Sequence, residues 1–247
     1  MRPYSLVPTV LLLLVASACS REPVREARAE PAPTPVESAA PAPTPPLSTA
    51  GRREDRPTVV FLGDSLTAGL GLGEEEAYPA LVGELLAERG LPIRVVNAGV
   101  SGDTSAGGLA RLDWLLSQRP AIVFVALGAN DGLRGQPVAA IAANLEAIVE
   151  RSRAAGARVV LAGMKMPPNY GPEYTRDFEA LYGALAQRER LPFLPFLLEG
   201  VAADPALNQP DGIHPTAEGQ RRIAAAVAAQ LEPVLHALTP PAAAAGR

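Results

Sequence analysis

Short apolar runs rich in valine and isoleucine alternate with longer segments of helical pattern over residues 57–238. Runs that are apolar throughout are typical of parallel strands, because helices cover both faces of a parallel sheet. The strand candidates are residues 58–62, 93–97, 122–127, 158–162 and 191–196. Pro192 and Pro195 interrupt the last run, and proline cannot donate a hydrogen bond to a neighbouring strand. We therefore expect the fifth strand at an edge of the sheet.

Helices are predicted between and after these strands, over residues 78–89, 105–118, 137–155, 174–190 and 216–231. In the last of them Ile223, Val227 and Leu231 recur at four-residue spacing, which places them on one face of the helix. Strands that alternate with helices indicate an α/β fold with a parallel sheet. Ligands of doubly wound sheets bind beyond the carboxyl ends of the strands, so the residues at those ends are the candidates for function.

The first residues have the pattern of a targeting segment. Arg2 precedes an apolar run that is shorter than the ~20 residues of a spanning helix, so residues 1–18 are predicted to be a signal peptide. Residues 16–19 read Ala-Ser-Ala-Cys, which resembles a bacterial lipobox. We expect a lipid anchor at Cys19 that holds the protein on the periplasmic side of the envelope, and Ser20 favours the outer membrane. An ordinary secretory peptide, and a soluble periplasmic or secreted protein, is the alternative.

A spacer is predicted after Cys19. Residues 31–46 contain seven prolines among alanine, serine and threonine, a composition that cannot bury a core. Residues 19–56 are therefore expected to be a linker and residues 57–238 a single folded domain, predicted to be monomeric. Residues 239–247 are an alanine- and proline-rich tail, predicted to be disordered.

Composition argues against several classes of protein. The chain has one cysteine, so no disulfide can form within it, and one cysteine with two histidines makes a zinc site of the common type implausible. The net charge is −4 and Lys165 is the one lysine, which argues against a nucleic-acid partner. The chemistry is expected to come from serine, aspartate, asparagine and histidine, without a metal or cofactor.

Short polar residues follow the first three strands and precede the last helix. They are Gly63-Asp64-Ser65-Leu66, Gly102, Asn130 and the pair Asp211 and His214. A serine hydroxyl needs a base within hydrogen-bond reach, and an imidazole suits that task. The second histidine, His236, falls in the last turn of a helix near the tail, where a structural role is favoured. We therefore predict Ser65 as nucleophile, His214 as base and Asp211 as the carboxylate that orients it.

A tetrahedral oxyanion needs donors that are already in place. The backbone N–H groups of Ser65 and Gly102 and the side-chain amide of Asn130 are the candidates. Pro215 restricts His214 to extended backbone geometry and is expected at the start of the following helix.

These residues resemble, in order, the four blocks of the GDSL or SGNH hydrolases, and longer runs resemble the bacterial thioesterase I/arylesterase/lysophospholipase branch. The longer runs are residues 101–105, 130–135, 167–171 and 211–215. The resemblance covers about residues 57–235. It implies a flavodoxin-like three-layer α/β/α sandwich with a five-stranded parallel sheet, a triad of Ser65, His214 and Asp211, and an oxyanion hole from Ser65, Gly102 and Asn130. Ala129 departs from this branch, which often has glycine there.

Several alternatives to this kind of ester hydrolysis have some support in the sequence. The glycines of residues 69–73 could suggest a nucleotide binder, but Glu74, Glu75 and Glu76 follow and would repel phosphates. The α/β-hydrolases are disfavoured because Ser65 lacks their G-x-S-x-G turn. A non-catalytic envelope-binding lipoprotein would not need the triad. An acetylesterase acting on cell-wall or polysaccharide acetyl groups shares the triad and is the main alternative.

The substrate is expected to be a small-molecule or lipid ester or thioester. The loop over residues 164–170 brings thioethers, prolines and an aromatic ring to the predicted crevice, although an ordinary surface loop is an equal alternative. The side chains predicted to contact substrate are Asp64, Leu133, Met166, Pro167, Tyr170 and Ile213.

Overall fold

The computed structural model describes residues 56–238. The predicted signal peptide, the predicted lipidation site Cys19, nearly all of the predicted linker and the predicted tail lie outside the described residues. Within residues 56–238, no helix combines the length and the apolar character that a membrane crossing requires.

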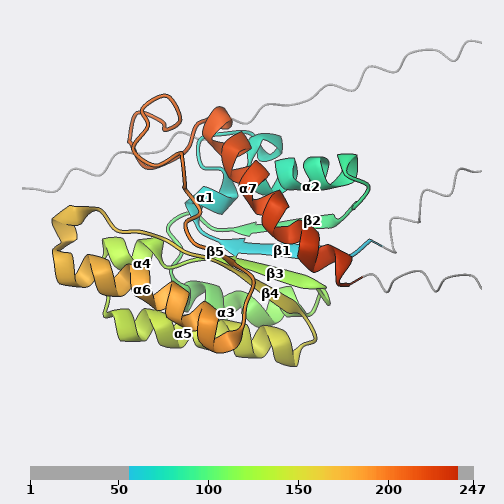
Figure 1. Ribbon diagram of the computed structural model, residues 1–247, viewed down its shortest axis with the longest axis horizontal. Coiled ribbons are helices and arrows are strands. Elements are labelled where there is room, and N and C mark those ends of the chain that lie inside the picture. The colour runs from blue at the N-terminus through green and yellow to red at the C-terminus, as the bar shows by residue number, and fades with distance from the viewer. Residues whose placement is uncertain (1–55, 239–247) are drawn as a thin grey trace, which may run out of the picture. The chain divides into compact units, whose positions relative to one another are not determined.

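Five parallel strands form one sheet, as predicted (Figure 1). They are β1 (Thr58–Gly63), β2 (Arg94–Gly99), β3 (Ile122–Ala126), β4 (Arg158–Ala162) and β5 (Phe193–Leu194). Their order across the sheet is β2-β1-β3-β4-β5, so β1, β3 and β4 are internal and β5 lies at an edge. Pro192 and Pro195 flank β5 and limit it to two residues, because neither proline has an N–H for the ladder.

Helices cover both faces of the sheet, which makes three layers (Figure 1). On one side lie α1 (Ser65–Ala68), α2 (Tyr78–Glu88) and α7 (Ala217–His236), and on the other α3 (Ser105–Leu116), α4 (Ala129–Leu133), α5 (Val138–Ala154) and α6 (Pro172–Glu189). Two 3₁₀ turns, η2 (Glu74–Glu76) and η3 (Pro168–Tyr170), complete the described elements. The predicted α/β/α sandwich is confirmed.

The core lies between the layers, and β1 and β3 are its centre. Every residue of both strands is buried, which explains why their sequences are continuously apolar. On one face of the sheet Phe61 and Phe124 meet Tyr78 of α2, with ring centroids 5.6 to 6.2 Å apart. This aromatic cluster holds α2 against the strands that lead into the site.

The strand register sets the carboxyl ends of three strands level. Gly63 of β1 pairs with Gly99 of β2 on one side and with Ala126 of β3 on the other. The loops that follow these strands therefore leave the sheet at the same edge. The polar residues that follow these strands in the sequence therefore lie close together at that edge.

Several boundaries differ from the sequence predictions. The last helix runs to His236 and passes through Pro233, whereas the pattern predicted an end at Leu231. This helix begins at Ala217 with Thr216 as its cap, so Pro215 precedes it and forms an isolated bridge with Asn208. The short helices α1 and α4 were not predicted, because four or five residues are too few for a helical period.

Candidate active site

Ser65 is the first residue of α1, directly after β1. The Asp64 carboxylate caps this helix, with Oδ1 accepting a hydrogen bond of 3.0 Å from the Leu66 N–H. The turn is tight: a Cβ at Gly63 would lie 1.9 Å from Thr67 Oγ1, and one at Gly99 would lie 2.2 Å from the Ala68 nitrogen. Glycine at the ends of β1 and β2 therefore lets α1 pack against the sheet and presents Ser65 at its edge.

The loop between β5 and α7 brings His214 and Asp211 to Ser65. His214 Nε2 lies 2.9 Å from Ser65 Oγ, and His214 Nδ1 lies 2.7 Å from Asp211 Oδ2. When Nδ1–H donates to the carboxylate, Nε2 is free to accept the serine proton. The structure thus brings together the three side chains that the sequence singled out.

Asp211 is held in its ionised form by the loop itself. Its Oδ1 accepts hydrogen bonds of 3.0 Å from the N–H groups of Ile213 and His214. These backbone donors, the His214 one first, and then the His214 side chain lower the pKa of Asp211 to about 2. The carboxylate is therefore negative at neutral pH and available to orient the imidazole.

Two glutamines tie the His214 segment to the Ser65 helix. Gln209 donates from Nε2 to the carbonyls of Leu70 (2.7 Å) and Pro215 (3.0 Å), and its N–H donates to the His214 carbonyl at 2.7 Å. The buried Gln220 of α7 donates from Nε2 to the Leu66 carbonyl at 3.1 Å. Sequence reasoning missed both residues. Gln209 belongs to no motif, whereas Gln220 lies three residues before Ile223 and seven before Val227, so a polar residue on the apolar face of the helix was the available signal.

The candidate oxyanion donors come from the loops after β1, β2 and β3. Ser65, Gly102 and Asn130 line one cavity. Gly102 has φ +79°, a left-handed conformation that favours glycine. A Cβ at this position would meet no described atom closer than Arg134 Nη2 at 3.8 Å, so conformation rather than crowding explains the residue.

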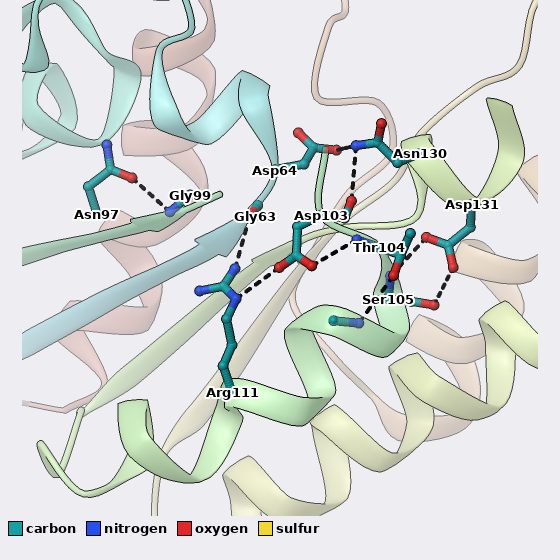
Figure 2. Close-up of polar contacts among 11 residues, drawn as sticks. Gly63, Asp64, Asn97, Gly99, Asp103, Thr104, Ser105, Arg111, Asn130 and Asp131 are labelled. Carbon is teal, nitrogen blue, oxygen red and sulfur yellow. Dashed lines mark hydrogen bonds and ion pairs between the residues drawn. The ribbon is translucent and has the colours of Figure 1, made fainter. Parts of the chain in front are cut away.

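The Asn130 amide is directed by two neighbours (Figure 2). Its Nδ2 donates to the Asp103 carbonyl at 2.9 Å and lies 3.4 Å from Asp64 Oδ2. Asp64 is 1% exposed, and burial raises the pKa of its carboxyl to about 6. The predicted substrate residue Asp64 thus also contacts the helix α1 and the amide of Asn130.

A cavity of about 590 Å³ opens beside Ser65 and His214. Of the residues predicted to contact substrate, Asp64, Leu133, Met166, Pro167 and Ile213 line it. The structure does not place Tyr170 in this lining. The hydroxyl of Tyr170, the last residue of η3, instead donates to the carbonyl of Leu133, the last residue of α4, at 3.0 Å, and this bond directs it to the backbone.

The cavity wall also contains apolar residues that sequence reasoning missed. Leu70 comes from the loop after α1, and Phe196, Leu198 and Ala202 come from the loop after β5. The signal was available, because residues 195–203 follow the carboxyl end of the fifth strand.

The second histidine lies elsewhere. His236 is in the last turn of α7, its side chain is 64% exposed, and its Nε2 is 4.0 Å from Glu232 Oε1. Over the described residues, no group of three or more histidine, cysteine, aspartate or glutamate side chains is arranged to hold a metal ion.

Comparison with known proteins shows which family the chain resembles. The GDSL-like Lipase/Acylhydrolase family matches residues 61–222. Esterase TesA of Pseudomonas aeruginosa is 47% identical over 179 residues, which is 72% of this chain and 89% of that protein. Thioesterase 1/protease 1/lysophospholipase L1 of Escherichia coli K12 is 42% identical over 180 residues, 72% of this chain and 85% of that protein.

A solved structure shows the same fold. The crystal structure of TesA superposes with a TM-score of 0.69 at 47% identity, covering 72% of this chain and 99% of that one. Together with the family match, this likeness confirms the resemblance that the four sequence blocks indicated. The chain belongs to the GDSL-like lipase/acylhydrolase family and is an ester hydrolase of the GDSL type.

Proposed function

We propose that this protein hydrolyses carboxylic esters or thioesters through a triad of Ser65, His214 and Asp211. The observation that carries the proposal is the continuous hydrogen-bonded path from Asp211 Oδ2 through the imidazole to Ser65 Oγ, with distances of 2.7 and 2.9 Å. The 2.9 Å distance lies within the range in which a base can take a proton from a hydroxyl, and the 2.7 Å contact orients that base.

In the first half of the reaction Ser65 Oγ attacks the carbonyl carbon of the substrate while His214 Nε2 takes the hydroxyl proton. The tetrahedral intermediate collapses when the imidazolium gives that proton to the leaving alkoxide, phenolate or thiolate. Asp211 stabilises the imidazolium without taking its proton. Water then attacks the acyl-enzyme by the same route and releases the acid and the free serine.

The negative oxygen of the intermediate is stabilised by the N–H groups of Ser65 and Gly102 and by Asn130 Nδ2. One amide proton of Asn130 is held by the Asp103 carbonyl at 2.9 Å. The other makes the longer, 3.4 Å contact with Asp64. That second proton is the one available to the oxyanion, since its contact with the Asp64 carboxylate is long for a hydrogen bond.

The cavity supports an acyl or aryl substrate. Its wall carries Met164, Met166, Phe196 and Leu198, which offer apolar surface to a chain or a ring. The relatives include proteins named esterase, arylesterase and thioesterase/lysophospholipase. We therefore assign esters and thioesters with apolar acyl or aryl groups as the substrate class.

Labelling and kinetics test the proposal. A p-nitrophenyl phosphonate should attach to Ser65, and Ser65→Ala should lose both the label and the hydrolysis of p-nitrophenyl butyrate. Ser117→Ala is the matched control, because Ser117 lies at the exposed end of α3 and donates to the Trp114 carbonyl. Attachment at another residue, or turnover by Ser65→Ala, would show that the nucleophile is a different group.

Asn130→Ala separates the oxyanion role from substrate binding. Because the amide acts on charge that develops in the transition state, kcat should fall by ~100-fold or more while KM changes little. A rise in KM at constant kcat would contradict the assigned role.

We also propose that the protein is exported and anchored by a lipid at Cys19. The proposal is supported by the apolar run of residues 6–18, by the lipobox-like residues 16–19 and by the position of the single cysteine of the chain.

A further inference from the structure

Arg111 of α3 belongs neither to the triad nor to the lining of the cavity, yet it joins two of the loops that form the site (Figure 2). Its Nε donates to Asp103 Oδ2 at 2.8 Å, and its Nη2 donates to the Gly63 carbonyl at 3.0 Å. Gly63 precedes the Asp64-Ser65 turn, and Asp103 follows Gly102. The guanidinium therefore ties the end of β1 to the loop after β2, beside the backbone hydrogen bond of 3.1 Å that the Gly63 carbonyl accepts from the Val100 N–H.

Asp103 extends this connection to the third loop. Its carbonyl accepts the Asn130 amide at 2.9 Å. Its N–H donates to the Val100 carbonyl at 3.0 Å, which closes the turn that contains Gly102. The orientation of Asp103 thus bears on two of the proposed oxyanion donors, the Gly102 N–H and the Asn130 amide.

The ion pair is sheltered from water. The side chains of Arg111 and Asp103 are 24% and 11% exposed, whereas those of Arg151 and Asp113, which join α5 to the same helix α3, are 42% and 75% exposed. A sheltered pair is screened less by salt and holds its geometry more tightly than a surface pair.

A glycine leaves the space that this carboxylate occupies. Gly107 lies inside α3, where glycine is less favourable than alanine. A Cβ at this position would lie 1.8 Å from Asp103 Oδ1. The space beside the helix is needed for the carboxylate that Arg111 holds.

We propose that Arg111 is a positioning residue for hydrolysis: by holding Asp103 against Gly63, it directs the Asn130 amide and the Gly102 turn toward one oxygen. The inference rests on the proposed function, because it concerns the same oxyanion donors. Preorganised donors stabilise the transition state, and a small misplacement of them costs rate. The residue therefore acts on kcat and leaves substrate binding nearly unchanged.

Steady-state kinetics with p-nitrophenyl butyrate test the role. Arg111→Met keeps the apolar stem and removes both donors, and it should lower kcat by ~10- to 100-fold with KM within about twofold. Arg111→Lys keeps the charge and should recover part of the loss. Gly107→Ala should also lower kcat, although it removes no charged group. Arg151→Met is the matched control and should keep wild-type kcat.

A double-mutant cycle separates positioning from a general structural effect. In the Asn130→Ala background the loss caused by Arg111→Met should shrink at least about fivefold, because the amide that it directs is absent. Equal losses in both backgrounds, an effect on KM alone, or wild-type kcat in Arg111→Met would each overturn the inference. If Arg111→Met does not fold, Arg111→Lys and Gly107→Ala carry the same cycle.

These experiments distinguish failure of the positioning role of Arg111 from failure of the proposed function. If the wild type neither hydrolyses the ester nor takes the phosphonate label at Ser65, the proposed function fails. If the wild type does both and Arg111→Met turns over at the wild-type rate, the proposed function stands and the positioning role is wrong.

Discussion

The buried carboxyl beside the nucleophile should make the protein less stable at neutral pH than it would be without that charge. Asp64 is 1% exposed, and burial, with a smaller contribution from Asp103, raises the pKa of its carboxyl to about 6 from an ordinary 3.8. The Leu66 N–H and the electrostatic effect of His214 act in the opposite direction. We expect Asp64→Asn to stabilise the fold at pH 8 and to have little effect near pH 4.

The sign and size of this change in stability follow from the linkage between folding and protonation of Asp64. Between pH 3.8 and about 6 the folded protein holds the Asp64 proton more tightly than the unfolded chain. Stability therefore falls as pH rises through this window and is constant above it. At ~1.4 kcal/mol per unit of pKa, the ionised carboxyl costs about 3 kcal/mol above pH 6.

The Asp64→Asn substitution removes that cost but introduces an unfavourable contact. Its carbonyl can still accept the Leu66 N–H, while its NH₂ group would face the Asn130 amide, which lies 3.4 Å from Asp64 Oδ2. Two facing donors offset part of the gain, so the net stabilisation at pH 8 should be about 1 to 3 kcal/mol.

Urea unfolding at pH 8 and at pH 4 measures the effect. The matched control is Asp204→Asn, because Asp204 is exposed and its Oδ1 accepts the same kind of local hydrogen bond, from the Ala206 N–H at 2.9 Å. That variant should show no comparable dependence on pH. Equal gains for Asp64→Asn at both pH values, or a loss at pH 8, would refute the assignment of the cost to a buried charge.

Two further predictions concern packing and location. Gln220→Leu should lower the free energy of unfolding by about 2 to 4 kcal/mol, because the Leu66 carbonyl and the Tyr78 N–H lose their buried partner. Urea unfolding measures the change, with the exposed Gln187→Leu as control, and a Gln220→Leu variant as stable as the wild type would refute the prediction. In cell fractionation the wild type should sediment with membranes and Cys19→Ser should be soluble, whereas equal solubility of the two would show that no lipid anchor forms.

The sequence was sufficient for the elements of the fold because their signals are local. Continuous apolar runs indicated buried parallel strands, and Pro192 and Pro195 indicated a weak edge strand, which β5 is. Shorter features were missed. The helix α1 has four residues, so it shows no periodicity, and its stability depends on the Asp64 cap and on packing against β2.

The chemical residues of the site could also be selected from the sequence alone. Parallel strands bring their carboxyl ends to one edge, so Ser65, Gly102 and Asn130 had to begin close together. The spacing of Asp211 and His214 allowed a contact within one loop, and the structure shows it at 2.7 Å. These conclusions need only chain direction and residue chemistry.

Tertiary structure decided which side chains hold those groups in place. Gln209 and Gln220 reach carbonyls 139 and 154 residues away, and Arg111 reaches one 48 residues away. The tertiary structure also directs the Tyr170 hydroxyl to the Leu133 carbonyl and buries Asp64. Such partners depend on strand register and on how helices pack across the sheet. No local pattern encodes that packing, because a long-range contact joins two segments that are far apart in the sequence, and neither segment alone determines its partner.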